Sequence, residues 1–278
     1  MTSIVHISDL HFGTEHPKIV EALQKDILSL KPSLVVVSGD LTQRATSPQF
    51  SAARDFLRSL PFPQIIIPGN HDISLFHVWR RFARTLGRYK EYITEEMYPS
   101  YVDDDIAVLG INTARSFTWK SGRISDAENA HIIDFFGKTG TNRRKILVMH
   151  HPLIPSSERA HDTILGRSEA AVMALDASGV DLVLAGHLHR GFTGDVHRFY
   201  PQAKRSILVV QAGTAVSVRL RGEANSYNFL TIGKESINVA VRMFDGRSFS
   251  EYATGVYGLD SFHWRMPEKL KTWTLYKE

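Results

Sequence analysis

Residues 4–40 run IVHISDLHFGTEHPKIVEALQKDILSLKPSLVVVSGD and contain two short apolar runs with a helical pattern between them. The first run leads into Asp9 and His11, and the second leads into Asp40. Between them, residues 17–30 place their apolar side chains mostly at three- and four-residue spacing, which gives one apolar helical face. Short apolar runs bounded by polar turns are typical of buried strands. A strand, a helix and a second strand in this order predict a βαβ unit on a parallel sheet.

The same pattern continues further along the chain. Three more apolar runs end on residues able to bind a metal or phosphate: IIIPGNHD leads into Asn70 and His71, ILVMHH into His150, and LVLAGHLH into His187 and His189. Helical patterns occur at residues 48–60, 126–136 and 168–178. In open α/β sheets, functional groups gather beyond the carboxyl ends of the strands. We therefore expect these polar residues to converge in one crevice.

After Gly186 the sequence no longer alternates between apolar runs and helical patterns. The runs ILVVQAG, SYNFLTI and INVAVRMF follow one another without helical patterns between them, which favours antiparallel strands and a second sheet packed on the first. The predicted fold is α/β, a two-sheet β-sandwich flanked by helices, in a single domain over residues 1–278. We expect a helical insertion at about residues 74–99 near the active site. The C-terminal tail from about residue 250 has no clear period.

Composition narrows the class of protein. Hydrophobic residues make up 43% and charged residues 22% of the 278 residues, which excludes disordered and fibrous architectures. No apolar stretch approaches the roughly 20 residues of a membrane span, and no signal peptide precedes Asp9, so we expect a cytoplasmic protein. The formal net charge is +4 and the chain has no cysteine. Any metal site must therefore be built from histidine, carboxylate and amide groups.

The residues that follow the five runs predict a metal site. Asp9 and His11 are one residue apart, and in an extended segment such side chains point to the same side. The candidate metal ligands are Asp9, His11, Asp40, Asn70, His150, His187 and His189. They are too many for one tetrahedral ion and suit two ions of five or six coordination. Two such ions neutralise a transferring phosphoryl group and lower the pKa of water, so phosphoester hydrolysis is the expected reaction.

His71 is predicted to act on the substrate and not on the metals. The reaction also needs a proton donor for the departing oxygen, or a donor to the charge developing on phosphorus. His71 adjoins Asn70 and is the candidate catalytic residue. Asp72 is a candidate to orient or charge its imidazole.

The ordered set Asp9-Leu-His11, Gly39-Asp40, Gly69-Asn-His-Asp72, His150 and Gly186-His-Leu-His189 resembles the calcineurin-like metallophosphoesterase superfamily. The resemblance covers residues 4 to about 190. It implies a β-sandwich with flanking helices and a role for His71 on the substrate phosphate. It also implies two divalent metal ions, with Mn²⁺ and Fe²⁺ or Fe³⁺ foremost and Zn²⁺ or Co²⁺ as further candidates. The first ion would be held by Asp9, His11, Asp40 and His189, and the second by Asp40, Asn70, His150 and His187.

One position departs from the pattern of many members. They carry the sequence GDxxD, whereas this chain has Gln43 in place of the second aspartate, a possible partner of the catalytic histidine. Asp72 is the candidate to replace it. In its spacing the chain looks most like the bacterial branch of cyclic-nucleotide and glycerophosphodiester phosphodiesterases.

Four functions remain open on the sequence. The leading one is a phosphodiesterase acting on small diesters such as 3′,5′-cyclic nucleotides. The second is a phosphomonoesterase, or a pyrophosphatase acting on nucleotide-linked lipid precursors. A DNA nuclease ranks third, because only residues 80–90 are densely basic and nucleic-acid binding needs a continuous basic surface. A non-enzymatic scaffold ranks last, since such copies are expected to have lost ligands. A homo-oligomer is left open.

Five further residues have weaker signals. His16 and His77 follow the first and third ligand runs and are candidates to meet substrate, although solvent-exposed histidines are the favoured interpretation. His6, inside the first run, is expected to be a hydrogen-bonded core histidine. Arg219 and Arg221 are candidates to pair with phosphate, but a solvated face of a strand is favoured for both.

Overall fold

The computed structural model describes residues 1–74, 85–116, 121–157, 164–220, 222–260 and 263–265. The strands within these ranges form two sheets. The seven-stranded sheet has the order β13-β12-β11-β10-β1-β2-β3, with bounds β1 Thr2–Ile7, β2 Leu34–Val37, β3 Gln64–Ile66, β10 Ser226–Ile232, β11 Ser236–Phe244, β12 Phe249–Asp260 and β13 His263–Arg265. The six-stranded sheet has the order β4-β5-β6-β7-β9-β8, with bounds β4 Ser100–Val102, β5 Ile106–Gly110, β6 Arg144–Val148, β7 Leu182–Ala185, β8 Phe192–Asp195 and β9 Leu208–Gln211.

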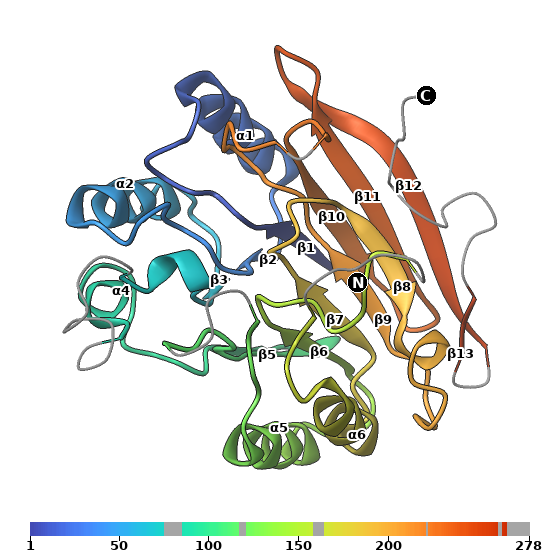
Figure 1. Ribbon diagram of the computed structural model, residues 1–278. Coiled ribbons are helices and arrows are strands. Elements are labelled where there is room, and N and C mark those ends of the chain that lie inside the picture. The colour runs from blue at the N-terminus through green and yellow to red at the C-terminus, as the bar shows by residue number, and fades with distance from the viewer. Residues whose placement is uncertain (75–84, 117–120, 158–163, 221, 261–262, 266–278) are drawn as a thin grey trace.

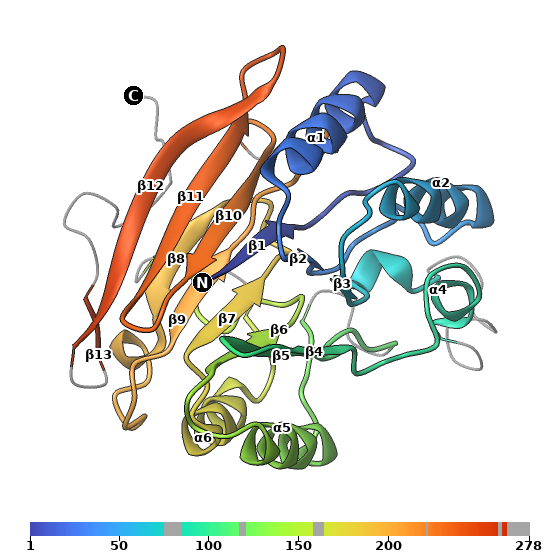
Figure 2. The same ribbon diagram turned by 180° about the vertical axis from the view of Figure 1, so that it is seen from behind.

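Helices cover the outer face of each sheet (Figures 1 and 2). The seven-stranded sheet packs against α1 (Pro17–Leu30), α2 (Ser47–Arg58) and α4 (Gly87–Tyr92). The six-stranded sheet packs against α5 (Asp126–Lys138) and α6 (Ser168–Ser178). Two short 3-10 helices, η1 (Asn70–Asp72) and η2 (Val196–Arg198), follow strands β3 and β8. The two-sheet sandwich flanked by helices is thus confirmed, and so are the four predicted helices, with ends shifted by two residues at most.

Strand β2 is apolar at every position because both of its faces are buried. Leu34 and Val36 point into the core between the two sheets, whereas Val35 and Val37 point outward into the core beneath α1 and α2. All four are fully buried. Burying such a side chain stabilises the fold by roughly 1.5–3 kcal/mol. A strand covered on both faces therefore favours apolar residues at every position.

The distribution of strands between the sheets differs from the prediction. The run ILVVQAG after Gly186, which was expected to be antiparallel, contains β9, which pairs antiparallel with β8 on one side but in parallel with β7 on the other. Strands β10 and β11 are antiparallel as expected, but β10 pairs with β1 and extends the N-terminal sheet. Each sheet is therefore mixed. The sequence pattern could not separate these cases, because a strand buried on both faces has the same composition in either sheet.

The C-terminal boundary also needs correction. Residues 249–260, which the sequence left in an unassigned tail, form β12 beside β11. The register passes from a pair between Val241 and Ala253 to a pair between Arg242 and Glu251, so Tyr252 is an extra residue in the strand. Such a bulge breaks the alternation of side chains on which a strand prediction depends.

The predicted insertion at about residues 74–99 lies partly outside the described residues, because residues 75–84 are among those not described. Within the remainder, α4 is a helix of six residues and residues 95–99 are irregular. No helix in the described parts of the chain is both long enough and apolar enough to cross a bilayer.

Candidate metal centre

The predicted ligands converge where the carboxyl ends of strands from the two sheets meet. Strands β1, β2 and β3 of one sheet supply Asp9, His11, Asp40 and Asn70, and strands β6 and β7 of the other supply His150, His187 and His189. Two groups of side chains have ligand atoms within 4.8 Å of one another. The first contains Asp9, His11, Asp40 and His189, and the second contains Asp40, His150 and His187. Asp40 belongs to both groups.

The backbone of these ligand loops is left-handed. Five of the seven residues have a positive φ: Asp9 (52°), His11 (48°), Asp40 (53°), His187 (79°) and His189 (58°). Residues other than glycine rarely adopt this conformation, which costs about 1–3 kcal/mol for each such residue. The expectation that paired ligands converge through an extended segment is therefore wrong. They converge because β1 and β7 each end in a tight left-handed turn.

The first group brings two carboxylate oxygens and two imidazole nitrogens close together. His11 Nε2 lies 3.7 Å from Asp9 Oδ1, 3.6 Å from Asp40 Oδ2 and 3.1 Å from His189 Nε2. Asp9 Oδ1 and Asp40 Oδ2 are buried and have no hydrogen-bond partner among the described residues. Leaving a buried charged oxygen unsatisfied is costly, and coordination of a cation removes that cost.

The second group places an amide oxygen beside two imidazoles. Asn70 Oδ1 lies 3.2 Å from His150 Nε2 and 3.0 Å from His187 Nδ1. His150 Nε2 is also 3.4 Å from Asp40 Oδ1. The amide oxygen of Asn70 thus lies beside the second group.

Backbone carbonyls fix which nitrogen of two histidines faces the centre. His150 Nδ1 lies 2.8 Å from the carbonyl oxygen of Ser38, and His189 Nδ1 lies 3.3 Å from that of Arg219. A ring nitrogen beside a carbonyl carries the proton and donates it, so the lone pair of a neutral ring is on Nε2. In both residues Nε2 faces other acceptors. This donor set fits a divalent cation in each group.

The electrostatics favour ionised carboxylates. Burial is the largest single influence and raises the pKa of Asp9 and of Asp40, but the neighbouring histidines together outweigh it, with His189 foremost for Asp9 and His150 foremost for Asp40, and both pKa values lie below the usual range. Burial and the charge of His150 lower the pKa of His187 to about 4. Burial also lowers the pKa of His150, but Asp40 overcomes this and raises it to about 9.

Two glycines allow the ligand loops to approach each other. Gly39 has a φ of 100°, and a side chain there would meet His150 Nδ1 at 2.6 Å. A side chain at Gly186 would meet the side chains of Ser8 and Asp9. The first glycine serves a left-handed turn and the second a close approach of β7 to the end of β1.

His71 lies at the rim of the cluster and belongs to neither group. Its backbone N–H donates to Asp40 Oδ1 at 2.8 Å, and its ring packs edge-on against His11 with centroids 4.8 Å apart. Its Nδ1 lies 2.9 Å from the carbonyl oxygen of Gln43. Burial lowers the pKa of His71. The Gln43 carbonyl fixes the orientation of the His71 ring through Nδ1.

Among the described residues the Asp72 carboxylate makes no hydrogen bond to the His71 ring, so the structure gives no support to its suggested role as the partner of that ring. Its carboxylate accepts the backbone N–H groups of Leu41 (3.1 Å), Thr42 (2.9 Å) and Gly69 (2.9 Å), together with the Thr42 hydroxyl. Asp72 thereby joins the loop after β2 to the loop after β3. Gln43, at the position of the missing aspartate, supplies the partner of His71 through its backbone.

Replacing Asp72 with asparagine is expected to destabilise the fold by about 2–4 kcal/mol, because one oxygen becomes an N–H donor that faces buried N–H groups. The midpoint of urea unfolding measures this loss. The matched control is Asp134→Asn on the exposed face of α5, for which we expect an unchanged midpoint. Lower turnover with unchanged stability would instead show that Asp72 acts on His71.

The five residues with weaker signals in the sequence are placed differently by the structure. His6 is a buried, hydrogen-bonded core histidine, with Nε2 2.9 Å from Ser38 Oγ, as predicted. His16 is exposed at the start of α1, as favoured. His77 and Arg221 lie outside the described residues. Arg219 does not lie on a strand, because residues 218–220 form a loop beside the site.

Several residues that act through their backbones were not predicted from the sequence. The carbonyls of Ser38 and Gln43 hold His150 and His71, and the hydroxyl of Thr214 donates to the carbonyl of Asp9 at 2.7 Å. Backbone groups are the same at every residue, so composition gives no signal for them. The position of Gln43 in the family pattern was the one available signal.

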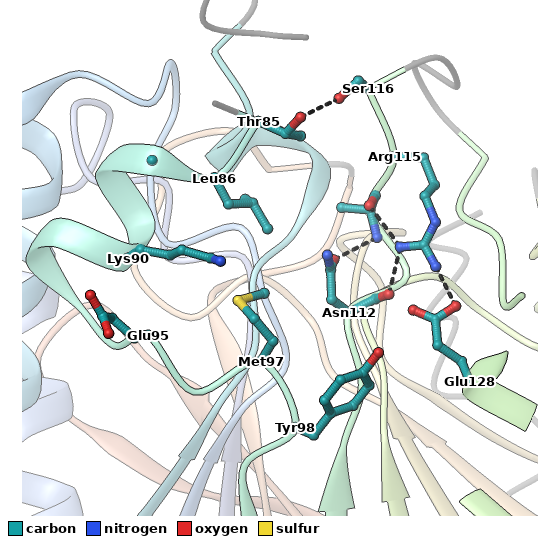
Figure 3. Close-up of a pocket in the computed structure, with 12 residues that line it drawn as sticks. Thr85, Leu86, Lys90, Glu95, Met97, Tyr98, Asn112, Arg115, Ser116 and Glu128 are labelled. Carbon is teal, nitrogen blue, oxygen red and sulfur yellow. Dashed lines mark hydrogen bonds and ion pairs between the residues drawn. The ribbon is translucent and has the colours of Figure 1, made fainter. Parts of the chain in front are cut away.

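A pocket of about 950 Å³ lies between the α4 segment and the loop after β5 (Figure 3). Lys90, Glu95 and Met97 line one side, and Asn112 and the ion-paired Arg115 and Glu128 line the other. This loop also contacts the metal centre: Thr113 Oγ1 lies 2.8 Å from His151 Nδ1, and the His151 ring lies 4.8 Å from that of His187. The described part of the predicted insertion thus borders the pocket.

A two-sheet sandwich with a buried Asp/His cluster where the strands end defines a metallophosphoesterase. The family model described as calcineurin-like phosphoesterase matches residues 2–191, which is more than half of the chain. This protein belongs to the calcineurin-like phosphoesterase family. The family is hydrolytic and uses divalent metal ions.

Curated relatives match about two thirds of the chain. A glycerophosphodiester phosphodiesterase, GpdQ, of Enterobacter lignolyticus is 27% identical over 208 residues, which cover 67% of this chain and 70% of that protein. A 3′,5′-cyclic-nucleotide phosphodiesterase of Nostoc is 25% identical over 219 residues, covering 71% of this chain and 75% of that protein.

Solved structures share the fold at low identity. A dimetal phosphatase from Danio rerio superposes with a TM-score of 0.65 at 13% identity, covering 91% of this chain and 98% of that one. A purple acid phosphatase from yellow lupin superposes with a TM-score of 0.69 at 12% identity over 91% of this chain, and this chain spans 53% of the lupin chain. The two neighbours support the architecture.

Proposed function

We propose that this protein is a two-metal phosphodiesterase that hydrolyses small diesters such as 3′,5′-cyclic nucleotides. The observation that carries the proposal is the pair of ligand groups that share Asp40. Related proteins named as glycerophosphodiester and cyclic-nucleotide phosphodiesterases support a diester over a monoester. The native metals are proposed to be Mn²⁺ or iron, because the ligands are oxygen and imidazole donors without thiolates. A cytoplasmic location stays a prediction.

The ligand residues and His71 have different roles in the proposed reaction. Asp9, His11, Asp40 and His189 would hold one cation, and Asp40, Asn70, His150 and His187 the other. When bound, the cations neutralise phosphoryl oxygens and lower the pKa of water, so that hydroxide is available at neutral pH. Asp40 serves both groups and also accepts the backbone N–H of His71, which ties the position of that imidazole to the centre.

His71 is proposed to donate the proton that the departing alcohol needs. With Nδ1 held by the Gln43 carbonyl, only Nε2 is available to the substrate. A bound phosphate anion stabilises the imidazolium and so opposes the effect of burial on the pKa of His71. As hydroxide attacks phosphorus and the bond to the alcohol breaks, Nε2 transfers its proton to the alcohol oxygen.

The pocket beside α4 is proposed to receive the alcohol portion of the diester. Its lining combines Met97 and Leu86 with Lys90, Glu95 and Asn112, which suits a group with both apolar faces and hydroxyls. A nucleoside and a glycerol headgroup both have this character.

A substrate panel on metal-reconstituted protein tests the proposal. Turnover of bis(p-nitrophenyl) phosphate is compared with turnover of a monoester and of a pyrophosphate, in Mn²⁺, Fe²⁺, Co²⁺ or Zn²⁺. We expect the diester to be hydrolysed fastest. The proposal fails if none of the four metals supports diester hydrolysis, or if the monoester or pyrophosphate reacts faster. DNA cleavage that falls steeply with salt would favour the nuclease alternative.

A further inference from the structure

The loop after β9 brings Arg219 to the rim of the metal centre. Backbone hydrogen bonds attach this loop to the first ligand loop: the N–H of Ala215 donates to the carbonyl of Ser8 (3.1 Å), and that of Val218 donates to the carbonyl of Thr14 (2.9 Å). The hydroxyls of Thr14 and Ser217 are 3.0 Å apart. Arg219 is therefore held next to the turn that presents Asp9 and His11, although it is about 200 residues away along the chain.

Two contacts place Arg219 between His71 and His189. Its backbone carbonyl faces His189 Nδ1 at 3.3 Å, and its guanidinium Nη1 donates to Gln43 Oε1 at 2.9 Å. The backbone carbonyl of the same Gln43 holds His71 Nδ1. Burial lowers the pKa of His71, and the nearby positive charge of Arg219 acts in the same direction. The guanidinium thus acts electrostatically on the residue that would meet the substrate.

No carboxylate in the described parts of the chain pairs with Arg219. Among the described residues it forms no ion pair, and its side-chain partner is the neutral amide of Gln43. Arg219 is half-buried, so its field is less screened than that of a fully exposed side chain. An aspartate or glutamate at position 43 would pair with the guanidinium and cancel its charge.

An arginine in this position suits a phosphoryl group. A guanidinium offers five N–H donors in a planar fork, and this geometry matches two oxygens of a phosphate. One N–H of Arg219 is used on Gln43, which leaves other donors for an anion. The bond to Gln43 restricts the guanidinium in advance, and less conformational entropy is then lost when an anion binds.

We propose that Arg219 is a phosphate-binding residue whose guanidinium contacts a non-bridging oxygen of the phosphoryl group, and that Gln43 positions this guanidinium without neutralising it. The inference rests on the proposed function for the identity of the substrate. It adds an anion contact that the metal ligands and His71 do not supply. It also gives a physical role to the neutral side chain of Gln43.

Binding of inorganic phosphate to the metal-loaded protein tests this inference without turnover. Isothermal titration calorimetry compares the wild type with Arg219→Gln, Arg219→Lys and Gln43→Glu, after the metal content of each has been measured. Loss of a charge-assisted hydrogen bond is expected to raise the Kd for phosphate about tenfold in Arg219→Gln. Arg219→Lys keeps the charge and should lie between that variant and the wild type. Gln43→Glu should have a Kd for phosphate close to that of Arg219→Gln, because the new carboxylate forms an ion pair with the guanidinium while the arginine stays in place.

The matched control is Arg58→Gln, which removes the same charge from the exposed end of α2 and should bind phosphate like the wild type. Equal affinity in Arg219→Gln and the wild type would overturn the inference, and so would loss of metal from Arg219→Gln. An unchanged Kd in Gln43→Glu would overturn the role of Gln43. If diester turnover is absent but phosphate binding depends on Arg219, the proposed function fails and the anion contact stands.

Discussion

Replacing Asp40 by alanine is expected to remove both metal ions and to lower kcat/KM for a diester by about a thousandfold or more. Both ligand groups contain Asp40, and its Oδ2 is a buried oxygen without a hydrogen-bond partner among the described residues. Two cations contribute several kcal/mol to stabilising the charge of a transferring phosphoryl group. Metal analysis of the purified, reconstituted protein measures the first effect, and steady-state kinetics measures the second.

The comparison variant is His189→Ala, because His189 belongs to the first ligand group only. We expect it to lose one ion and to retain the other, so its metal content should lie between those of Asp40→Ala and the wild type. Circular dichroism establishes that each variant is folded, since Asp40 also accepts the N–H of His71. Retention of two ions by Asp40→Ala would disprove the shared site.

Replacing His71 by alanine is expected to lower kcat by about a hundredfold to ten-thousandfold, the usual contribution of a proton donor, while metal content stays near that of the wild type. The side chain of His71 belongs to neither ligand group. Its backbone N–H, which holds Asp40 Oδ1, is kept in the variant. His71→Ala should therefore lose turnover and keep its metal ions, whereas Asp40→Ala should lose both.

A matched control for His71→Ala is His16→Ala, an exposed histidine at the start of α1 whose side chain makes no capping hydrogen bond. We expect the control to retain wild-type turnover. A substrate with a good leaving group, such as p-nitrophenolate, should be less sensitive to His71→Ala than an alkyl diester, because it departs without a proton. Loss of metal from His71→Ala would mean that His71 is itself a ligand.

Much of the fold was predictable because its determinants are local. Strand β2 is apolar at each of its four positions, and α1 places Ile19, Leu23 and Ile27 on one buried face. These patterns give the alternation of strands and helices over most of the chain. Strand β12 was missed because the extra residue Tyr252 breaks its alternation.

The chemical character of the centre follows from the sequence alone. The sequence supplied the Asp, His and Asn donors, placed each of them after a strand and excluded thiolate ligands. The tertiary structure alone decided how these donors divide into two groups, because that depends on left-handed turns at Asp9, Asp40 and His187. It also decided that Gln43 is the hydrogen-bond partner of the His71 ring, and that Arg219 lies at the same rim. These contacts join loops far apart in the chain, and their distances follow from how the two sheets pack, which no local pattern encodes.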